Sequence, residues 1–322
     1  MVISLETLSE NRKALMGCAT IGVLACHAAA NDVHLPSIMM SILGLGQIGV
    51  DIFFFLSGFG LFYSLSKDNV KIGQWYRKRF LRIFVPYIII YSPALLLTCV
   101  DTGKGWHYFL YNLSMLSFWF GDDGCWFISV LAVFYLIAPF WKSMLDKSKF
   151  SVLLTFSIAC LLYLIDFVYS YPMAGAFSQG LFFFVGMLVA KRINGGGKIL
   201  TNKNIIALAC LFILLLFLYS LFHFCPLLWI LFFPFIIIVC VLLDYCKIKL
   251  ISKVLDFMGN ISLESYLLNV TLIVWIDYFS LLPTDFYTYR YAFIVGIGII
   301  LSYIVNKLSI VIVGKILAMS PK

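Results

Sequence analysis

The chain alternates long apolar segments with short polar ones. A helix needs about 17–25 mostly apolar residues to cross the roughly 30 Å hydrocarbon core of a bilayer. Segments of about this length recur along the whole chain, at residues 14–30, 42–64, 83–100, 124–143, 150–169, 173–190, 204–222, 226–244, 262–281 and 291–307. The pattern predicts an all-α, polytopic membrane protein with about ten transmembrane helices.

Composition indicates the same class of protein. Of the 322 residues, 63% are hydrophobic and 12% are charged, and the mean hydropathy is +1.02. A soluble globular domain has about 45–50% apolar and about 25% charged residues. The stretches between the apolar segments are too short to form domains of their own. We therefore expect residues 1–322 to form a single integral-membrane domain.

The basic residues predict an orientation. All of the 23 Lys and Arg residues except Lys104 and Arg290 fall on one side of the membrane if both termini are cytoplasmic. Cytoplasmic segments of membrane proteins carry such an excess of Lys and Arg. The net charge of +8 thus indicates topology and contact with anionic lipid, and it gives no support for nucleic-acid binding.

The nine cysteines show no metal-binding pattern. No pair has the CxxC spacing, and most lie inside predicted helices. Free Cys in such positions usually serves as a small packing residue. We therefore expect no metal.

His27 lies inside the first apolar segment, near its outer end in the predicted topology. Ionisable residues are costly to bury in a membrane helix and usually have a function there. Histidine can take and return a proton near neutral pH, so His27 is a candidate general base.

Asp51 lies in the segment GVDIFFFLSGFG (residues 49–60), at a depth similar to that of His27. A carboxylate bonded to one ring nitrogen would fix the tautomer and leave the other nitrogen as the base. The alternative interpretation is that Asp51 bonds a hydroxyl or backbone group and only holds helices together. Small residues here predict close helix packing, namely Gly44, Gly46, Gly49, Ser57, Gly58 and Gly60.

A basic cluster of Arg77, Lys78, Arg79 and Arg82 precedes the third apolar segment. Taken alone, such a cluster is most often a lipid-facing topology signal. However, Arg79 and Arg82 are three residues apart and share one face of a helix. Two guanidinium groups on one face suit bidentate binding of a phosphate or diphosphate.

Together these features resemble bacterial acyltransferase family 3, membrane O-acyltransferases that modify cell-surface glycans. The resemblance rests on His27, GVDIFFFLSGF from Gly49, Arg79-x-x-Arg82 with Pro86, Trp126-Phe127 followed by Phe134-Tyr135-Leu136, and Gly259-x-x-Ser262 with Tyr266-Leu267-Leu268. It implies ten helices in a bacterial cytoplasmic membrane, a catalytic role for His27, and acetyl-CoA as the usual acyl donor.

Three positions depart from the family pattern. Met16 stands where the family usually has Arg or Lys, eleven residues before the histidine, and Arg12, one turn earlier on the same face, could compensate. Leu131 replaces a frequent Glu, so no role for that acid transfers. Asn269 replaces a frequent histidine, so we expect no second catalytic histidine there.

These features suggest one mechanism. Coenzyme A would bind Arg79, Arg82, Arg77 and Arg12 from the cytoplasm, and its pantetheine arm would reach His27, where a glycan hydroxyl enters from outside. Further candidates for the substrate channel are Ser57, Trp126, Tyr135, Glu264, Tyr266 and Asn269. An end-capping role for Ser262 beside Glu264 is an equal alternative. The expected partners are the glycan acceptor, membrane lipid, and further copies of the chain or other glycan-assembly proteins.

A second function remains open from the sequence alone. A multi-pass transporter or permease for a sugar or lipid-linked intermediate would also place His27, Asp51, Glu264 and Asn269 in the membrane. Transporters of this kind often show inverted repeats and paired broken helices. The sequence shows neither feature, which favours the acyltransferase.

Overall fold

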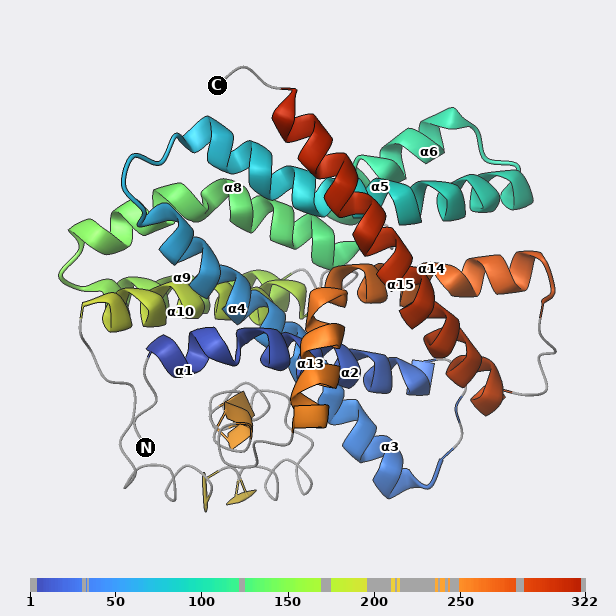
Figure 1. Cartoon of the computed structure of the whole chain (residues 1–322), viewed down its shortest axis with the longest axis horizontal. Coiled ribbons are helices and arrows are strands. Elements are labelled where there is room, and N and C mark those ends of the chain that lie inside the picture. Colours follow the sequence, from blue (N-terminus) through green and yellow to red (C-terminus); the bar gives the residue numbers. More distant parts are fainter. Residues whose placement is uncertain are drawn as a thin grey trace.

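The computed structural model describes residues 5–30, 33, 35–121, 125–168, 175–195, 249–281 and 287–319, with isolated residues between 210 and 243. Their regular secondary structure is helical (Figure 1). The helices are α1 (Leu5–Glu10), α2 (Arg12–Ala30), α3 (Ser37–Gly44), a 3-10 turn η1 (Leu45–Gln47), α4 (Ile48–Leu65), α5 (Ile72–Thr102), α6 (Trp106–Leu113), α7 (Leu116–Trp119), α8 (Trp126–Lys147), α9 (Ser151–Val168), α10 (Ala176–Asn194), α13 (Lys249–Asn260), α14 (Ser262–Tyr278) and α15 (Tyr287–Ala318). The all-α prediction is confirmed for this part of the chain.

Fewer spanning helices are found than the hydropathy pattern predicts. Among the described residues, six helices are long and apolar enough to cross a membrane, and the bent pair formed by α13 and α14 makes a seventh if it counts as one span. The six comprise α3 with α4 (Ser37–Leu65), α5, α8, α9, α10 and α15. The predicted spans 204–222 and 226–244 lie largely outside the described residues.

Two helices keep most of their apolar surface on the outside of the bundle. Only 17% of the apolar window of α9 and 22% of that of α15 is buried. Phe156 and Phe167 on α9 and Ile300 on α15 are exposed. Large contiguous apolar patches of this kind mark contact with a membrane or partner. Together with the long apolar helices, they characterise a multi-pass membrane protein.

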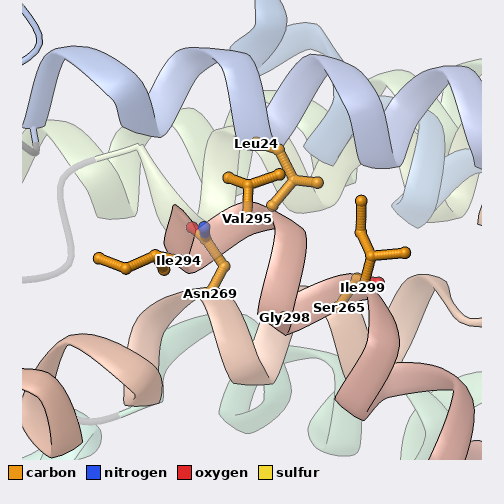
Figure 2. A pocket seen from close by; sticks show the side chains of 7 residues that line it. All are labelled: Leu24, Ser265, Asn269, Ile294, Val295, Gly298 and Ile299. Atoms are coloured by element: carbon orange, nitrogen blue, oxygen red, sulfur yellow. The ribbon is translucent and has the colours of Figure 1, made fainter. Parts of the chain in front are cut away.

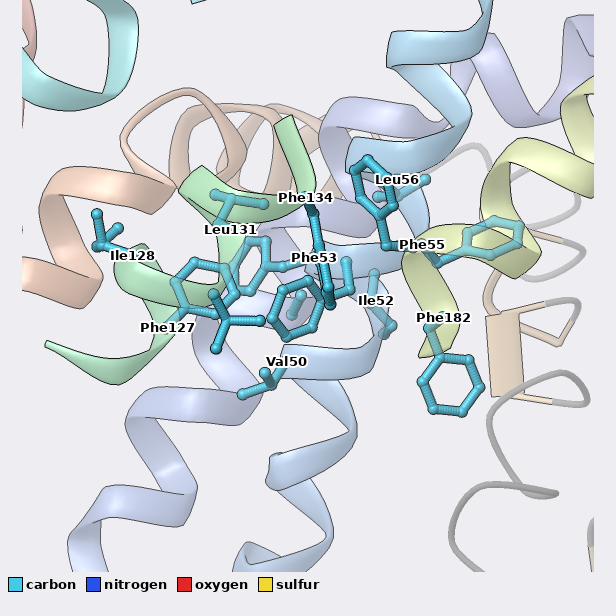
Figure 3. Close-up of a cluster of buried hydrophobic side chains, with 14 of the residues drawn as sticks. Val50, Ile52, Phe53, Phe55, Leu56, Phe127, Ile128, Leu131, Phe134 and Phe182 are labelled. Atoms are coloured by element: carbon cyan, nitrogen blue, oxygen red, sulfur yellow. The ribbon is translucent and has the colours of Figure 1, made fainter. Parts of the chain in front are cut away.

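The core lies where α4, α8 and α10 meet. Figure 3 shows aromatic and aliphatic side chains of α4 packed against Phe127 and Phe134 of α8. The ring centroids of Phe54 and Phe127 are 5.0 Å apart, within the range of favourable aromatic pairs. The backbones of α4 and α10 approach closely at Gly58, where an added Cβ would lie 1.9 Å from the carbonyl oxygen of Phe183. This contact agrees with the predicted packing role of small residues in this segment.

Helix α5 is longer than the predicted span 83–100, because it begins at Ile72 and includes the basic cluster. Arg79 and Arg82 are therefore helical residues on one face, as their spacing predicts. Pro86 and Pro93 lie within the helix. Within the helix, the basic residues precede the apolar part.

Helices α13 and α14 meet at a sharp bend of 67°. Figure 1 shows α13 crossing α2, whereas α14 turns away to run beside α5. The crossing is close because glycine stands at the contact: a Cβ at Gly259 would lie 2.0 Å from the carbonyl oxygen of Lys13. The bend is thereby placed beside the first turn of α2.

Candidate active site

A cavity of about 660 Å³ lies between the first turns of α2 and α14, residues 78–83 of α5 and the second half of α15. Six of its lining residues are cationic, namely Arg12, Lys13, Lys78, Arg79, Arg82 and Lys307. Glu264 is the one acidic residue among the described side chains that line it. The cavity therefore carries a strong excess of positive charge, which favours a multiply charged anion.

Arg12 reaches this cavity through a gap that glycine leaves. Its Nη2 donates to the carbonyl oxygen of Leu56 at 3.4 Å. A Cβ at Gly60 would lie 2.7 Å from the same nitrogen, so a side chain at position 60 would displace the guanidinium group. Met16 also lines the cavity, one turn further along α2. The structure thus brings Arg12 to the region where the family pattern places a basic residue at position 16.

The break between α13 and α14 forms another wall. Gly259, Asn260, Ile261 and Ser262 line the cavity there. Ile261 is the N-cap of α14, and no side chain bonds the cap, so the alternative capping role of Ser262 is not formed. The first backbone N–H groups of α14 lie at this wall, and an N-terminus of a helix attracts anions.

Glu264 is buried and held by a neighbouring amide. Its Oε1 accepts a hydrogen bond from Asn306 Nδ2 at 3.0 Å, and the same amide nitrogen lies 3.2 Å from the carbonyl oxygen of Asn260. These bonds tie α15 to the bend between α13 and α14. Glu264 thus lines the predicted channel, as does Tyr266.

The inner wall of the cavity is aromatic. Phe53, Phe127 and Tyr266 line it, and the ring centroids of Phe127 and Tyr266 are 5.1 Å apart. Ser57 and Tyr135 from the predicted channel set also line the cavity. Trp126 is not among the lining residues, and its ring packs on Phe127 at 5.9 Å.

His27 lies at the other end of α2. At 1.5 Å per residue, position 27 is about 22 Å along the helix axis from position 12. His27 Nδ1 is 2.7 Å from Asn269 Oδ1 on α14. Asn269 is three residues after Tyr266, so this contact begins about one helical turn beyond the aromatic wall.

Asp51 does not pair with His27, contrary to the sequence hypothesis. The Nδ1 position is taken by Asn269, and Asp51 is 2% exposed. Within the part of the chain that the structure describes, Asp51 Oδ1 has no hydrogen-bond partner. Depth in the membrane can be counted along a helix, whereas pairing also depends on which way α4 is rotated about its axis.

Arg77 is turned away from the cavity that Arg79 and Arg82 line. Its Nη2 donates to the carbonyl oxygen of Ile316 at 2.7 Å, which links α5 to the end of α15. Adjacent helical residues point in directions about 100° apart, so the four basic residues of the cluster cannot all share one face. The predicted binding set is thereby divided into Arg12, Arg79 and Arg82 in the cavity and Arg77 outside it.

The sequence hypothesis omitted several residues that the structure brings to these sites. Lys13, Asn306 and Lys307 line the cavity, and Tyr291 bonds Asn269 at 3.2 Å. Lys13 and Lys307 carried a signal as basic residues near helix ends. No sequence pattern indicated Asn306 or Tyr291, because the partners of both lie on other helices. Among the described residues, no group of three or more His, Cys, Asp or Glu side chains could hold a metal ion.

Comparison with known proteins identifies the family. The family model described as an acyltransferase domain, of the acyltransferase 3 type, matches residues 14–307. The acyltransferase MdmB of Streptomyces mycarofaciens is 26% identical over 147 residues, which cover 40% of this chain and 38% of that protein. No solved structure matches. With a family model that spans His27 and most of the residues lining the cavity, the chain belongs to acyltransferase family 3.

Proposed function

We propose that the protein is an O-acyltransferase of the bacterial cytoplasmic membrane. It moves an acyl group, acetyl from acetyl-CoA in the simplest case, to a hydroxyl of a cell-surface or exported glycan. The observation that carries this proposal is the pairing of a cationic cavity with a histidine about 22 Å further along the same helix. Family membership supports acyl transfer as the reaction.

The cavity suits the charged end of coenzyme A. That part of the molecule carries a diphosphate and a further phosphate, and three guanidinium groups with three ammonium groups line the cavity. Guanidinium groups bind phosphate oxygens in pairs through parallel N–H donors. The cavity volume lies within the range of about 300–1,000 Å³ usual for small-molecule sites. In this proposal the cavity opens to the cytoplasm, where the donor is made.

The thin, flexible pantetheine arm of coenzyme A would connect the cationic cavity to His27. The pantetheine part of coenzyme A would extend past Phe53, Phe127 and Tyr266 toward Asn269 and His27. Aromatic and aliphatic walls suit this largely uncharged chain. The acceptor hydroxyl would approach His27 from the outer side, so that donor and acceptor enter from opposite faces.

The chemistry at His27 is a proton transfer coupled to attack on the thioester. His27 takes the proton of the acceptor hydroxyl as its oxygen forms a bond to the carbonyl carbon. The tetrahedral intermediate then breaks its carbon–sulfur bond, and the imidazolium returns the proton to the departing thiolate. An ester and free coenzyme A result, and His27 is again neutral. General-base catalysis of this kind typically contributes about 10²–10⁴-fold.

The test follows the release of free thiol from acetyl-CoA by purified protein, with and without the isolated surface-glycan fraction. We expect glycan-dependent release of coenzyme A and a matching acetyl mass increment on the glycan. A transporter would bind or move a glycan without consuming the thioester. Thiol release that does not respond to the glycan, or no consumption at all, would contradict the proposal.

A further inference from the structure

The hydrogen bond between His27 and Asn269 leaves one question of chemistry open, namely which ring nitrogen carries the proton. A neutral imidazole has one N–H donor and one nitrogen with a lone pair. Asn269 could face Nδ1 with its oxygen, which needs a proton on Nδ1, or with its NH₂ group, which needs a lone pair there. Only the first arrangement leaves the lone pair on Nε2.

The hydrogen bonds of the Tyr291 hydroxyl, on the other side of Asn269 from His27, determine which arrangement forms. The Tyr291 hydroxyl contacts the backbone carbonyl oxygen of Leu24, which can only accept a hydrogen bond. The single hydroxyl proton of Tyr291 is therefore donated to that carbonyl. The Tyr291 oxygen can then only accept from Asn269, whose Nδ2 lies 3.2 Å away. The amide oxygen of Asn269 is thereby directed at His27 Nδ1, at 2.7 Å.

Because Asn269 and Tyr291 are buried, this orientation of the Asn269 amide is fixed. Asn269 is 3% exposed and Tyr291 is 6% exposed. Figure 2 shows Asn269 between α2, which carries Leu24, and α15, which carries Ile294 and Val295. A reversed amide would set its oxygen against a tyrosine oxygen whose proton is already used. Two buried acceptors would then face each other without a donor, which is strongly unfavourable.

We propose that Tyr291 is a positioning residue that sets the tautomer of His27 through Asn269. The chain of bonds from the Leu24 carbonyl through Tyr291 and Asn269 holds the proton on Nδ1 and the lone pair on Nε2. This inference rests on the proposed function of His27 as a general base. It assigns to a neutral amide and a phenol the orienting role for which the sequence suggested the carboxylate of Asp51.

The first test is Tyr291→Phe, which removes the hydroxyl and keeps the ring. Without the hydroxyl, the Asn269 amide is free to turn its NH₂ group toward His27, and most of the protein then carries the proton on the wrong nitrogen. We expect the maximal rate of acetyl transfer from acetyl-CoA to the surface-glycan fraction to fall by roughly 10- to 100-fold, a part of the contribution of a general base. The KM for acetyl-CoA should stay unchanged, because the hydroxyl does not line the cavity.

The second test separates orientation from packing. A carboxylate has no donor end, so Asn269→Asp accepts from His27 Nδ1 whichever way it turns. In the Asn269→Asp background, Tyr291→Phe should therefore lower the maximal rate by less than about 3-fold. If Tyr291 only packs α15 against α2, Tyr291→Phe should lower the maximal rate by the same factor in both backgrounds. Equal factors, or no loss from Tyr291→Phe alone, would overturn the proposal.

A third variant covers the case in which Tyr291→Phe does not fold. Asn269→Leu has a similar size but no acceptor, so it should lose more of the rate than Asn269→Asp, which keeps an acceptor toward His27 Nδ1. Equal losses of rate in Asn269→Asp and Asn269→Leu, with both variants folded, would also overturn the proposal. His27→Ala is measured beside these variants. If it retains transfer, the proposed function fails; if it abolishes transfer while Tyr291→Phe does not alter the rate, only this inference fails.

Discussion

The two ends of helix α2 lie in opposite chemical environments. The Arg12 end borders a cavity with six cationic side chains, whereas the His27 end is held by a chain of neutral hydrogen bonds between buried groups. The first environment favours a multiply charged anion. The second fixes one imidazole nitrogen through the amide oxygen of Asn269. In the proposed mechanism, one helix serves both parts of the reaction, with donor binding at one end and proton transfer at the other.

The largest expected effect comes from His27→Ala. Loss of the general base should lower the rate of acetyl transfer by about 10²–10⁴-fold. The KM for acetyl-CoA should remain within a few-fold, because the cationic end of α2 is unchanged. The measurement is glycan-dependent release of coenzyme A by protein of verified expression and membrane insertion. A large rise in KM together with the lost rate would show that donor binding and proton transfer do not depend on separate ends of α2.

A smaller effect is expected from Arg79→Ala combined with Arg82→Ala. The loss of even one hydrogen bond to a charged group costs about 1.5–3 kcal/mol, so the KM for acetyl-CoA should rise by at least about 10-fold. Because chemistry occurs at the other end of α2, the rate at saturating donor should change little.

The neighbouring Arg77→Ala is the matched control. Arg77 bonds the carbonyl of Ile316 outside the cavity, so its loss should leave the KM near that of the unaltered protein. Equal KM values for the double variant and for Arg77→Ala would mean that the whole basic cluster serves only topology.

Gly60→Ala should have a moderate effect on the cationic end alone. The added methyl group would lie 2.7 Å from Arg12 Nη2, and the flexible guanidinium would move away without unfolding the helix pair. We expect the KM for acetyl-CoA to rise by roughly 3- to 10-fold, since one of several charge-assisted contacts is weakened. Gly44→Ala is the control, because a Cβ there meets no atom within 4 Å. Matching KM values for the two variants would remove Arg12 from donor binding.

The smallest effect is expected from Asp51→Asn. Asp51 is buried away from His27, so the neutral amide should leave the rate within about 3-fold of the unaltered protein and should keep or raise the melting temperature. Enzyme kinetics and a thermal melt in detergent measure both quantities. A loss of rate comparable to that of His27→Ala would indicate that the Asp51 carboxylate takes part in the reaction.

Local patterns predicted much of this molecule. Apolar length predicted most of the described helices, and the three-residue spacing of Arg79 and Arg82 predicted their shared face. Both depend only on neighbours in the sequence. The place of Arg12 beside this pair followed from counting one turn back from Met16 on a single helix.

The contacts between residues of different helices could not be predicted from the sequence. Asp51 was expected at the depth of His27, but the segment 49–60 is apolar all round and gives no signal of its rotation. Asn269 is 242 positions from its partner His27, and the sequence marked it as a departure from the family pattern and a channel candidate, but not as the partner of His27. Tyr291 had no signal at all, because its role depends on how α2, α14 and α15 meet.

Equilibrium binding of coenzyme A tests the separation of the two ends most directly. Purified His27→Ala and the Arg79→Ala, Arg82→Ala double variant are titrated with coenzyme A in the same detergent, beside the unaltered protein. The account predicts that His27→Ala binds as tightly as the unaltered protein, while the double variant binds at least about 10-fold more weakly. Weaker binding by His27→Ala, with unchanged binding by the double variant, would contradict it.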